Sequence, residues 1–162
     1  MAASGRHHLW WGVLLLLGWQ LGAVAWAEEN GTELIDRAWA RAMLEGNLDG
    51  IMNCYADDAS AWFPGSGNLY GSKAIRDSYA HLLADNQIKG VDFSDMHYVG
   101  GVGKRSAGWG LFSITLQPKA GGDPVILKGR FTEVAEKRGG RWVYIVDHAS
   151  AEPPPPVTTA TQ

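Results

Sequence analysis

The second half of the sequence alternates between four long segments rich in β-branched and aromatic residues and three short turns. The turns lie at residues 100–103, 119–124 and 137–140, and each contains glycine, which favours turns. Short connections between long strands make consecutive strands antiparallel neighbours. The pattern therefore predicts an antiparallel sheet built from residues 91–99, 106–116, 125–136 and 141–150.

The stretch before these strands has the periodicity of amphipathic helices, with apolar residues three and four positions apart. Thr32 and Ser72 are predicted to be N-caps, because their hydroxyls can accept hydrogen bonds from backbone amides. Gly46 is expected to end the first helix. The predicted helices are residues 32–44, 48–55 and 73–84, and a short strand is predicted at residues 59–63.

Three helices ahead of an antiparallel sheet predict the α+β class, with the helices packed on one face of the sheet. The sheet must curve around them, which leaves a conical space. Side chains fill its narrow end, and a ligand can occupy its wide end. The chain of 162 residues has room for one such domain, which we assign to residues 28–152. Residues 153–162 begin with four prolines and are expected to be disordered.

Residues 1–27 have the three parts of a secretory signal peptide. Arg6 gives a positive start, residues 9–17 form an apolar centre, and Ala25 and Ala27 provide the small residues that a signal peptidase requires. We expect cleavage before Glu28 and a periplasmic or secreted protein. The alternative is an uncleaved leader that anchors the protein in a membrane.

Composition argues against nucleic acid, disulfides and metals as parts of the function. The net charge is −3 and the Lys and Arg residues form no cluster, so no basic surface for nucleic acid is predicted. Cys54 is the single cysteine, which excludes an internal disulfide and a multi-cysteine metal site. The histidines show no metal-ligand spacing. We therefore expect no metal and no cofactor.

The last predicted strand, residues 141–150, is informative for function because ionisable residues interrupt its apolar pattern near the end. Strict alternation puts Tyr144 and His148 on one face and Asp147 on the other. Whichever face looks inward therefore brings an ionisable side chain, Asp147 or His148, towards a cavity or its rim. The alternative is that both side chains end in solvent or bond to a neighbouring loop.

Four local motifs carry a family resemblance: residues 45–49 (Glu-Gly-Asn-Leu-Asp), 55–59 (Tyr-Ala-Asp-Asp-Ala), 71–76 (Gly-Ser-Lys-Ala-Ile-Arg) and 140–150, which end in His-Ala-Ser. Together with the order of elements they resemble the nuclear transport factor 2-like superfamily, and more narrowly its SnoaL-like, ketosteroid-isomerase-like group. The resemblance covers residues 33–152. The sequence is also similar to the association domain of calcium/calmodulin-dependent kinases, which assembles subunits. The resemblance implies a conical pocket and, because dimers are common in the superfamily, a homodimer.

In isomerases of this group a carboxylate moves a proton beside a carbonyl while a tyrosine and a protonated acid stabilise the enolate. The candidate acids for this chemistry are Asp58 and Asp147, although an acid such as Asp58 at a helix-to-strand junction is more often structural. His148 is a further candidate acid–base residue because of its place near the end of the last strand. The candidate ligand-binding residues, whose alternative role is plain packing or an ion pair, are Tyr55, Trp62, Tyr79, Trp109 and Arg130.

Arg130 lies in a largely apolar predicted strand and needs a partner. Asp147, Glu133 or a bound carboxylate could supply it, and His148 nearby would complete a pocket for a small acid. The alternative is an ion pair exposed to water.

Two hypotheses for function follow. The favoured one is a non-catalytic module, which binds a small hydrophobic or acidic molecule in its pocket or serves assembly, with no reaction assigned. The other is a cofactor-independent isomerase, dehydratase or cyclase.

Overall fold

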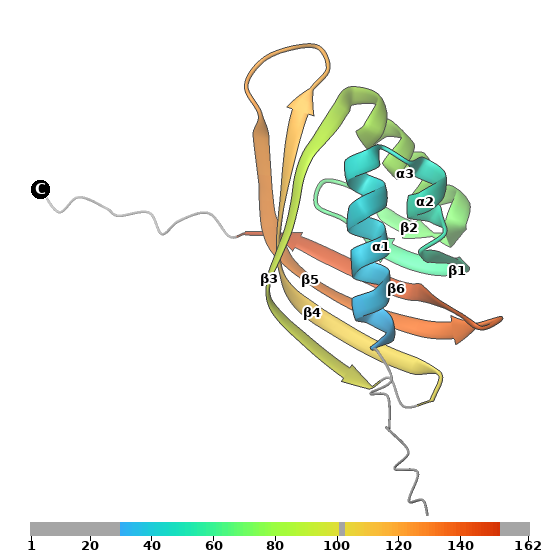
Figure 1. The fold of residues 1–162 in the computed structure, drawn as a ribbon. Helices are drawn as coiled ribbons and strands as arrows, with labels where there is room; N and C mark the ends of the chain where they lie inside the picture. Colours follow the sequence, from blue (N-terminus) through green and yellow to red (C-terminus); the bar gives the residue numbers. More distant parts are fainter. Residues whose placement is uncertain (1–29, 101–102, 153–162) are drawn as a thin grey trace, which may run out of the picture.

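The computed structural model describes residues 30–100 and 103–152, so the predicted signal peptide and proline-rich tail lie outside the described residues. Within these ranges the chain has the expected α+β fold, with helices packed on one side of a curved six-stranded sheet (Figure 1). The elements are α1 (Gly31–Glu45), α2 (Leu48–Met52), β1 (Tyr55–Trp62), β2 (Asn68–Tyr70), α3 (Gly71–Asp85), β3 (Asn86–Gly100), β4 (Arg105–Pro118), β5 (Val125–Arg138) and β6 (Arg141–Ala151).

The strand order of the sheet is β2-β1-β6-β5-β4-β3. Strands β3 to β6 are consecutive antiparallel neighbours, as predicted from the short turns. β1 pairs with β6 in parallel, which the turn pattern did not predict because the two strands are far apart in the sequence. α1 packs against β3, β4, β5 and β6, while α3 packs mainly against β1. Figure 1 shows α1 lying inside the bend of the long strands, so the sheet curves around this helix.

α1 begins with an N-cap at Asn30, whereas Thr32 was the predicted N-cap. The Asn30 side chain accepts a hydrogen bond from the Thr32 backbone N–H at 3.0 Å, and Thr32 is buried in the first turn. Asparagine caps helices at least as well as threonine, so an effective cap was present two residues earlier. Gly46 ends the helix in the left-handed conformation, with φ 63°, as predicted.

Replacing Asn30 by alanine is expected to lower the free energy of unfolding by about 1 kcal/mol, because it removes the side-chain acceptor at the start of α1. Urea denaturation followed by circular dichroism measures the change. Asn30→Asp keeps the acceptor and should restore most of the stability. The matched control is Asn53→Ala, at an exposed asparagine, which should change the free energy by less than about 0.5 kcal/mol. Equal stability of the two alanine variants would contradict the assigned cap.

Two predicted boundaries between helix and strand are wrong. α2 ends at Met52 rather than at residue 55, and β1 begins at Tyr55 rather than at residue 59. The cause is pairing with β6, because the Cys54 carbonyl oxygen accepts a hydrogen bond from the Tyr144 N–H at 2.7 Å. This contact brings the stretch after α2 into the sheet earlier than its local sequence suggests.

α3 also differs from the prediction at its start. It begins at Gly71 rather than at residue 73, and its N-cap is Tyr70, which makes no side-chain capping hydrogen bond. Ser72, the predicted cap, lies in the first turn. Gly71 has a φ of 81°, which favours glycine, and a Cβ there would lie 3.4 Å from the Asp57 carbonyl oxygen. The path of the chain at Gly71 therefore sets the start of the helix.

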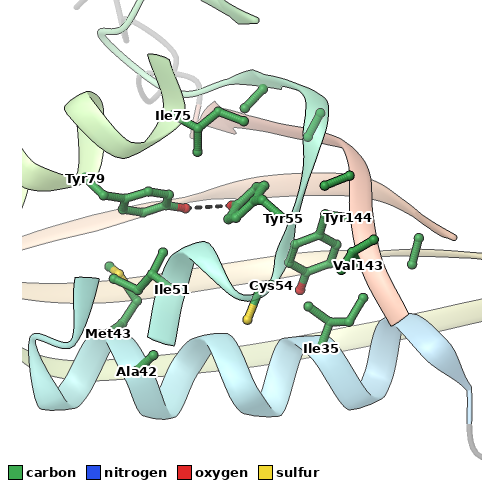
Figure 2. Packing of buried hydrophobic residues seen from close by; sticks show 14 of the residues in the cluster. Ile35, Ala42, Met43, Ile51, Cys54, Tyr55, Ile75, Tyr79, Val143 and Tyr144 are labelled. Carbon is green, nitrogen blue, oxygen red and sulfur yellow. Dashed lines mark hydrogen bonds between the residues drawn. The ribbon is translucent and has the colours of Figure 1, made fainter. Parts of the chain in front are cut away.

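A hydrophobic core lies between the helices and the sheet. Met43, Ile51 and Ile75 are fully buried, and one comes from each helix of the described chain. Tyr55 and Tyr79 belong to the same cluster, and their hydroxyl groups point towards one another (Figure 2). The core therefore contains a polar contact between two tyrosine side chains.

Candidate functional site

A cavity of about 300 Å³ lies between the helices and the sheet. Its walls come from α1, α3, the loop after β1 and strands β3 to β6. Most of the lining is apolar, and the described residues that line it include no Lys, Arg or His. The aromatic lining residues are Trp39, Phe63, Tyr79, Phe93, Phe112, Phe131 and Tyr144, and the carboxyl groups are those of Glu133 and Asp147. A cavity with this lining suits a small, mostly apolar molecule.

A bulge in β6 determines which side chains of this strand face the cavity. Two neighbouring residues of β5 pair with Tyr144 and Val146, so Ile145 is an extra residue in β6. The extra residue shifts the alternation by one position, and Tyr144 and Asp147 both line the cavity. The prediction that these two side chains lie on opposite faces is therefore wrong, because it assumed strict alternation along the strand.

Asp147 ends a chain of hydrogen bonds that starts at Trp39. The Trp39 Nε1–H donates to the Tyr79 Oη at 2.9 Å, the Tyr79 and Tyr55 hydroxyls are 2.8 Å apart, and the Tyr55 hydroxyl donates to Asp147 Oδ2 at 2.5 Å. Tyr55 uses its proton at Asp147, so Tyr79 must donate to Tyr55. Every proton in the chain thus points towards Asp147, an arrangement that stabilises its ionised form.

The ionisation of Asp147 is set by two opposing effects. Burial raises the pKa of Asp147 to about 6, the hydrogen bond from Tyr55 opposes the increase, and the negative charge of Asp36 adds to it. The carboxyl is therefore mostly ionised at pH 7 and can still take up a proton near neutral pH. Among the described side chains, Tyr55 is the hydrogen-bond donor to Asp147, and it uses Oδ2, which leaves Oδ1 for a ligand.

A second group of polar side chains surrounds Asp36 of α1, which is buried. The Tyr98 hydroxyl donates to Asp36 Oδ2 at 3.0 Å, and the Tyr144 hydroxyl donates to Oδ1. Burial raises the pKa of Glu133 well above its ordinary value, and a hydrogen bond to Asp36 and the charge of Asp36 raise it further. Glu133 therefore carries a proton at neutral pH. The cavity wall combines this neutral carboxyl group with the mostly ionised carboxyl group of Asp147.

The family model described as a SnoaL-like domain matches residues 37–145. The chain belongs to this family. The matched residues run from α1 into β6, so they include most of the elements that form the cavity. The SnoaL-like resemblance seen in the sequence is therefore confirmed.

Several solved structures share the fold of this SnoaL-like protein. A ketosteroid isomerase-like protein from Erwinia carotovora atroseptica has a TM-score of 0.65 and 16% identity, over 75% of this chain and 94% of that chain. A provisionally assigned dehydratase of the nuclear transport factor 2-like family from Streptomyces avermitilis has a TM-score of 0.66 and 20% identity, over 75% of this chain and 94% of that chain. A provisionally assigned calcium/calmodulin-dependent protein kinase II association domain from Xanthomonas campestris has a TM-score of 0.67 and 25% identity, over 75% of this chain and 85% of that chain. No curated protein matches the sequence.

Three of the site residues predicted from the sequence come together beside the cavity. Tyr79 of α3 and Asp147 of β6 line it, and Tyr55 of β1 links the two through its hydroxyl group. All three side chains are buried. Their functional role stays a prediction.

The predicted histidine and tryptophan residues lie on the other face of the sheet. His148 is exposed and packs edge-on against Trp62, with 6.4 Å between the ring centroids. Trp109 is 40% exposed and stacks on His97, with 5.5 Å between the ring centroids. None of these residues lines the cavity. A role for His148, Trp62 or Trp109 would therefore have to be on the outer face of the sheet.

The predicted charged residues Arg130 and Asp58 also lie outside the cavity lining. Arg130 is exposed and is paired in register with Ser150, so the structure does not bring it to Asp147. Asp58 is exposed and forms an ion pair with Arg138 at 2.5 Å. This pair fits the interpretation that Asp58 has a structural and not a catalytic role. Exposed ion pairs of this kind contribute little to stability.

The site residues that sequence reasoning missed are Trp39, Asp36, Tyr98 and Glu133, the last of which was considered only as a partner of Arg130. A signal for Glu133 was present, because Phe131 and Ala135, two positions to either side, share its face of β5 and are apolar. Asp36 and Tyr98 gave no such signal. Their contact joins residues 62 positions apart, which a local pattern does not reveal.

Proposed function

We propose that this SnoaL-like protein is a cofactor-independent acid–base enzyme of the isomerase or dehydratase class. It acts on a small, mostly apolar molecule, with Asp147 as the proton acceptor. The observation that carries the proposal is a buried carboxylate with a pKa of about 6 that faces an apolar cavity through one free oxygen. A general base works best when its pKa lies near the operating pH. The fold shared with ketosteroid isomerase-like and dehydratase-like proteins supports this class.

The geometry supports the following steps. A ligand in the cavity places a carbon-bound hydrogen, acidified by a neighbouring carbonyl, against Asp147 Oδ1. The carboxylate takes the proton, and the hydrogen bond from Tyr55 holds the carboxyl in place. The protonated carboxyl then returns the proton to another carbon, which is isomerisation, or gives it to a departing hydroxyl group, which leaves as water in a dehydration. The apolar walls keep water from competing for the proton.

The charges around the cavity favour a neutral ligand. Its described lining has the two carboxyl groups of Glu133 and Asp147 and no cationic side chain. An anionic ligand would be repelled by Asp147 and would find no partner for its charge. The sequence led us to expect a small hydrophobic or a small acidic ligand, and of these two we propose the hydrophobic one.

A deuterium-exchange assay distinguishes the enzyme from a pocket that only binds. Small cyclic ketones such as 2-tetralone are first screened for binding, because a ligand of the native state raises the melting temperature. Ketones that bind are then incubated with the protein in D₂O, and deuterium uptake is measured by mass spectrometry. Faster uptake beside the carbonyl supports proton transfer. Binding of the whole panel without faster uptake would support the binding hypothesis and contradict ours.

Replacing Tyr55 by phenylalanine is expected to raise the pKa of Asp147 by about one unit, because a hydrogen bond to the ionised form is lost. The pH midpoint of the exchange rate would then move upward by the same amount. Tyr79→Phe is the matched control. It removes a hydroxyl group that reaches the carboxylate only through Tyr55, so it should change the pKa of Asp147 by less. An unchanged midpoint in Tyr55→Phe would show that the chain of hydrogen bonds does not tune Asp147.

Export and assembly remain proposals. The signal peptide of residues 1–27 and its cleavage lie outside the described residues. No helix within the described ranges is long and apolar enough to cross a membrane. The structure describes a single chain, so the homodimer also stays a prediction. Sequencing the N-terminus of exported protein and sedimentation of the purified protein would test the two proposals.

A further inference from the structure

The proposed proton transfer needs a partner for the carbonyl oxygen of the ligand as well as a base. When Asp147 takes the proton, the electron pair of the broken C–H bond moves towards this oxygen, which gains negative charge. A hydrogen-bond donor held beside the oxygen lowers the barrier, because it stabilises the charge where it develops. The described cavity lining contains no Lys, Arg or His, so a donor among its side chains must be a neutral group.

The aromatic donors of the lining already give their protons to the protein itself. The Trp39 Nε1–H donates to the Tyr79 Oη, and the Tyr79 hydroxyl donates to Tyr55. The Tyr144 hydroxyl donates to Asp36. A ligand would have to break one of these hydrogen bonds to use any of the three donors.

Ser66, in the loop after β1, is also engaged. Its hydroxyl lies 3.0 Å from the Phe63 carbonyl oxygen and 3.1 Å from that of Gly67, and it accepts a hydrogen bond from the Phe63 N–H. It therefore holds the loop together. Glu133 is only 4% exposed, and its Oε1 is fully buried, so a ligand cannot reach this oxygen.

Ser78 of α3 carries the hydroxyl group of the lining that the fold leaves free. It lines the cavity and is partly buried, and the residues that the structure describes offer no hydrogen-bond partner to its side chain. A serine inside a helix can donate to the carbonyl oxygen four residues earlier, here that of Ala74. No such bond forms within the described chain, so the Ser78 proton is available to a ligand.

The position of Ser78 on α3 places it on the inner face of the helix. Ile75 and Leu82, three residues before it and four residues after it, share its face. Ile75 is fully buried and Leu82 lines the cavity. Tyr79, the next residue, also lines the cavity, and Figure 2 shows the side chains of Ile75 and Tyr79 pointing into the core. Ser78 is thus a polar residue within the apolar stripe of an amphipathic helix.

We infer that Ser78 donates a hydrogen bond to the carbonyl oxygen of the ligand and stabilises the negative charge that forms when Asp147 takes the proton. The inference rests on the proposed function and adds a second catalytic residue to it. Ser78 lies in α3 and Asp147 in β6, and both line the cavity. The ligand is then a neutral carbonyl compound held with its oxygen towards α3 and the hydrogen that it loses towards β6.

Infrared difference spectroscopy of a bound ketone tests the inference on the full chain. The probe is a ketone that binds, such as 2-tetralone, labelled with carbon-13 at its carbonyl group. A hydrogen bond to a carbonyl oxygen lowers its stretching frequency, so we expect a higher frequency in Ser78→Ala than in the native protein. Ser78→Thr keeps the hydroxyl group and should keep the native frequency. Ser72→Ala, the same change at a serine of α3 outside the cavity lining, is the matched control.

The deuterium-exchange rate at saturating ketone gives a second readout. Ser78→Ala is expected to exchange about 100-fold more slowly than the native protein, the usual effect of removing one donor to a developing negative charge. Ser78→Thr should retain most of the rate, and Ser72→Ala should exchange at the native rate. Melting curves of the variants show that each is folded.

The outcomes separate this inference from the proposed function. Equal carbonyl frequencies in the native protein and Ser78→Ala would overturn the role of Ser78 and leave Asp147 as the proposed base. A higher frequency in Glu133→Met in place of Ser78→Ala would also overturn it and assign the donor to Glu133. A higher frequency in Ser78→Ala with no exchange by the native protein would contradict the proposed function and support Ser78 as a binding residue. Failure of the native protein to bind any ketone would overturn both proposals.

Discussion

Replacing Asp147 by asparagine is expected to slow protein-catalysed deuterium exchange in a bound ketone by about two to four orders of magnitude. Asparagine has the same shape, and its Oδ1 can accept the hydrogen bond that the Tyr55 hydroxyl donates in the native protein. The amide cannot take a proton from carbon at neutral pH, so the change removes the base and keeps the packing. The rate is measured by mass spectrometry at saturating ketone.

Binding and a control variant separate chemistry from structure in this experiment. Asp147→Asn should still bind the ketone, because most of the cavity surface is apolar and unchanged. Asp57→Asn, at an exposed acid of β1, should exchange at the native rate. The native rate should rise with pH as Asp147 ionises, with a midpoint near pH 6, and level off above it. A native rate in Asp147→Asn would exclude Asp147 as the base.

The parts of the fold that could be predicted are those that local chemistry determines. Consecutive strands β3 to β6 follow from strand-forming segments and tight turns, and Gly139 and Gly140 indeed adopt positive φ values. The parallel pairing of β1 with β6 could not be predicted in this way. It depends on contacts such as Tyr144 N–H to Cys54 O, between residues 90 positions apart, and local propensity carries no information about them.

The candidate site was predicted in part for the same reason. Asp147 could be selected because an acid near the end of an apolar strand is unusual, but its contact with Tyr55 spans 92 residues. The single extra residue Ile145 then decided which neighbours face inward, and a bulge has no clear signature in this strand. His148 was an equal candidate under strict alternation, and the structure places it on the exposed face.

The substitution that removes the base is also expected to stabilise the protein at neutral and basic pH. Burial raises the pKa of Asp147 from its ordinary value of 3.8 to about 6, so the native state holds its proton more tightly than the unfolded state. Between these values the unfolded chain is ionised while the native carboxyl is still protonated. The free energy of unfolding therefore falls as pH rises from about 4 to about 6, and above pH 6 the ionised native carboxyl costs about 3 kcal/mol.

Asparagine does not titrate, so Asp147→Asn avoids this loss. Urea denaturation at a series of pH values should show the two proteins within about 0.5 kcal/mol at pH 4 and the variant more stable by about 3 kcal/mol at pH 8. Native Glu133 is expected to keep its proton over this pH range in both proteins, because burial raises its pKa, so its contribution cancels in the difference between them. The exposed control Asp57→Asn should show no such pH-dependent gain. If Asp147→Asn were less stable than the native protein at pH 8, the ionised carboxylate would be stabilising the core. Asp147 would then be a structural residue and not a base that lowers the stability of the fold.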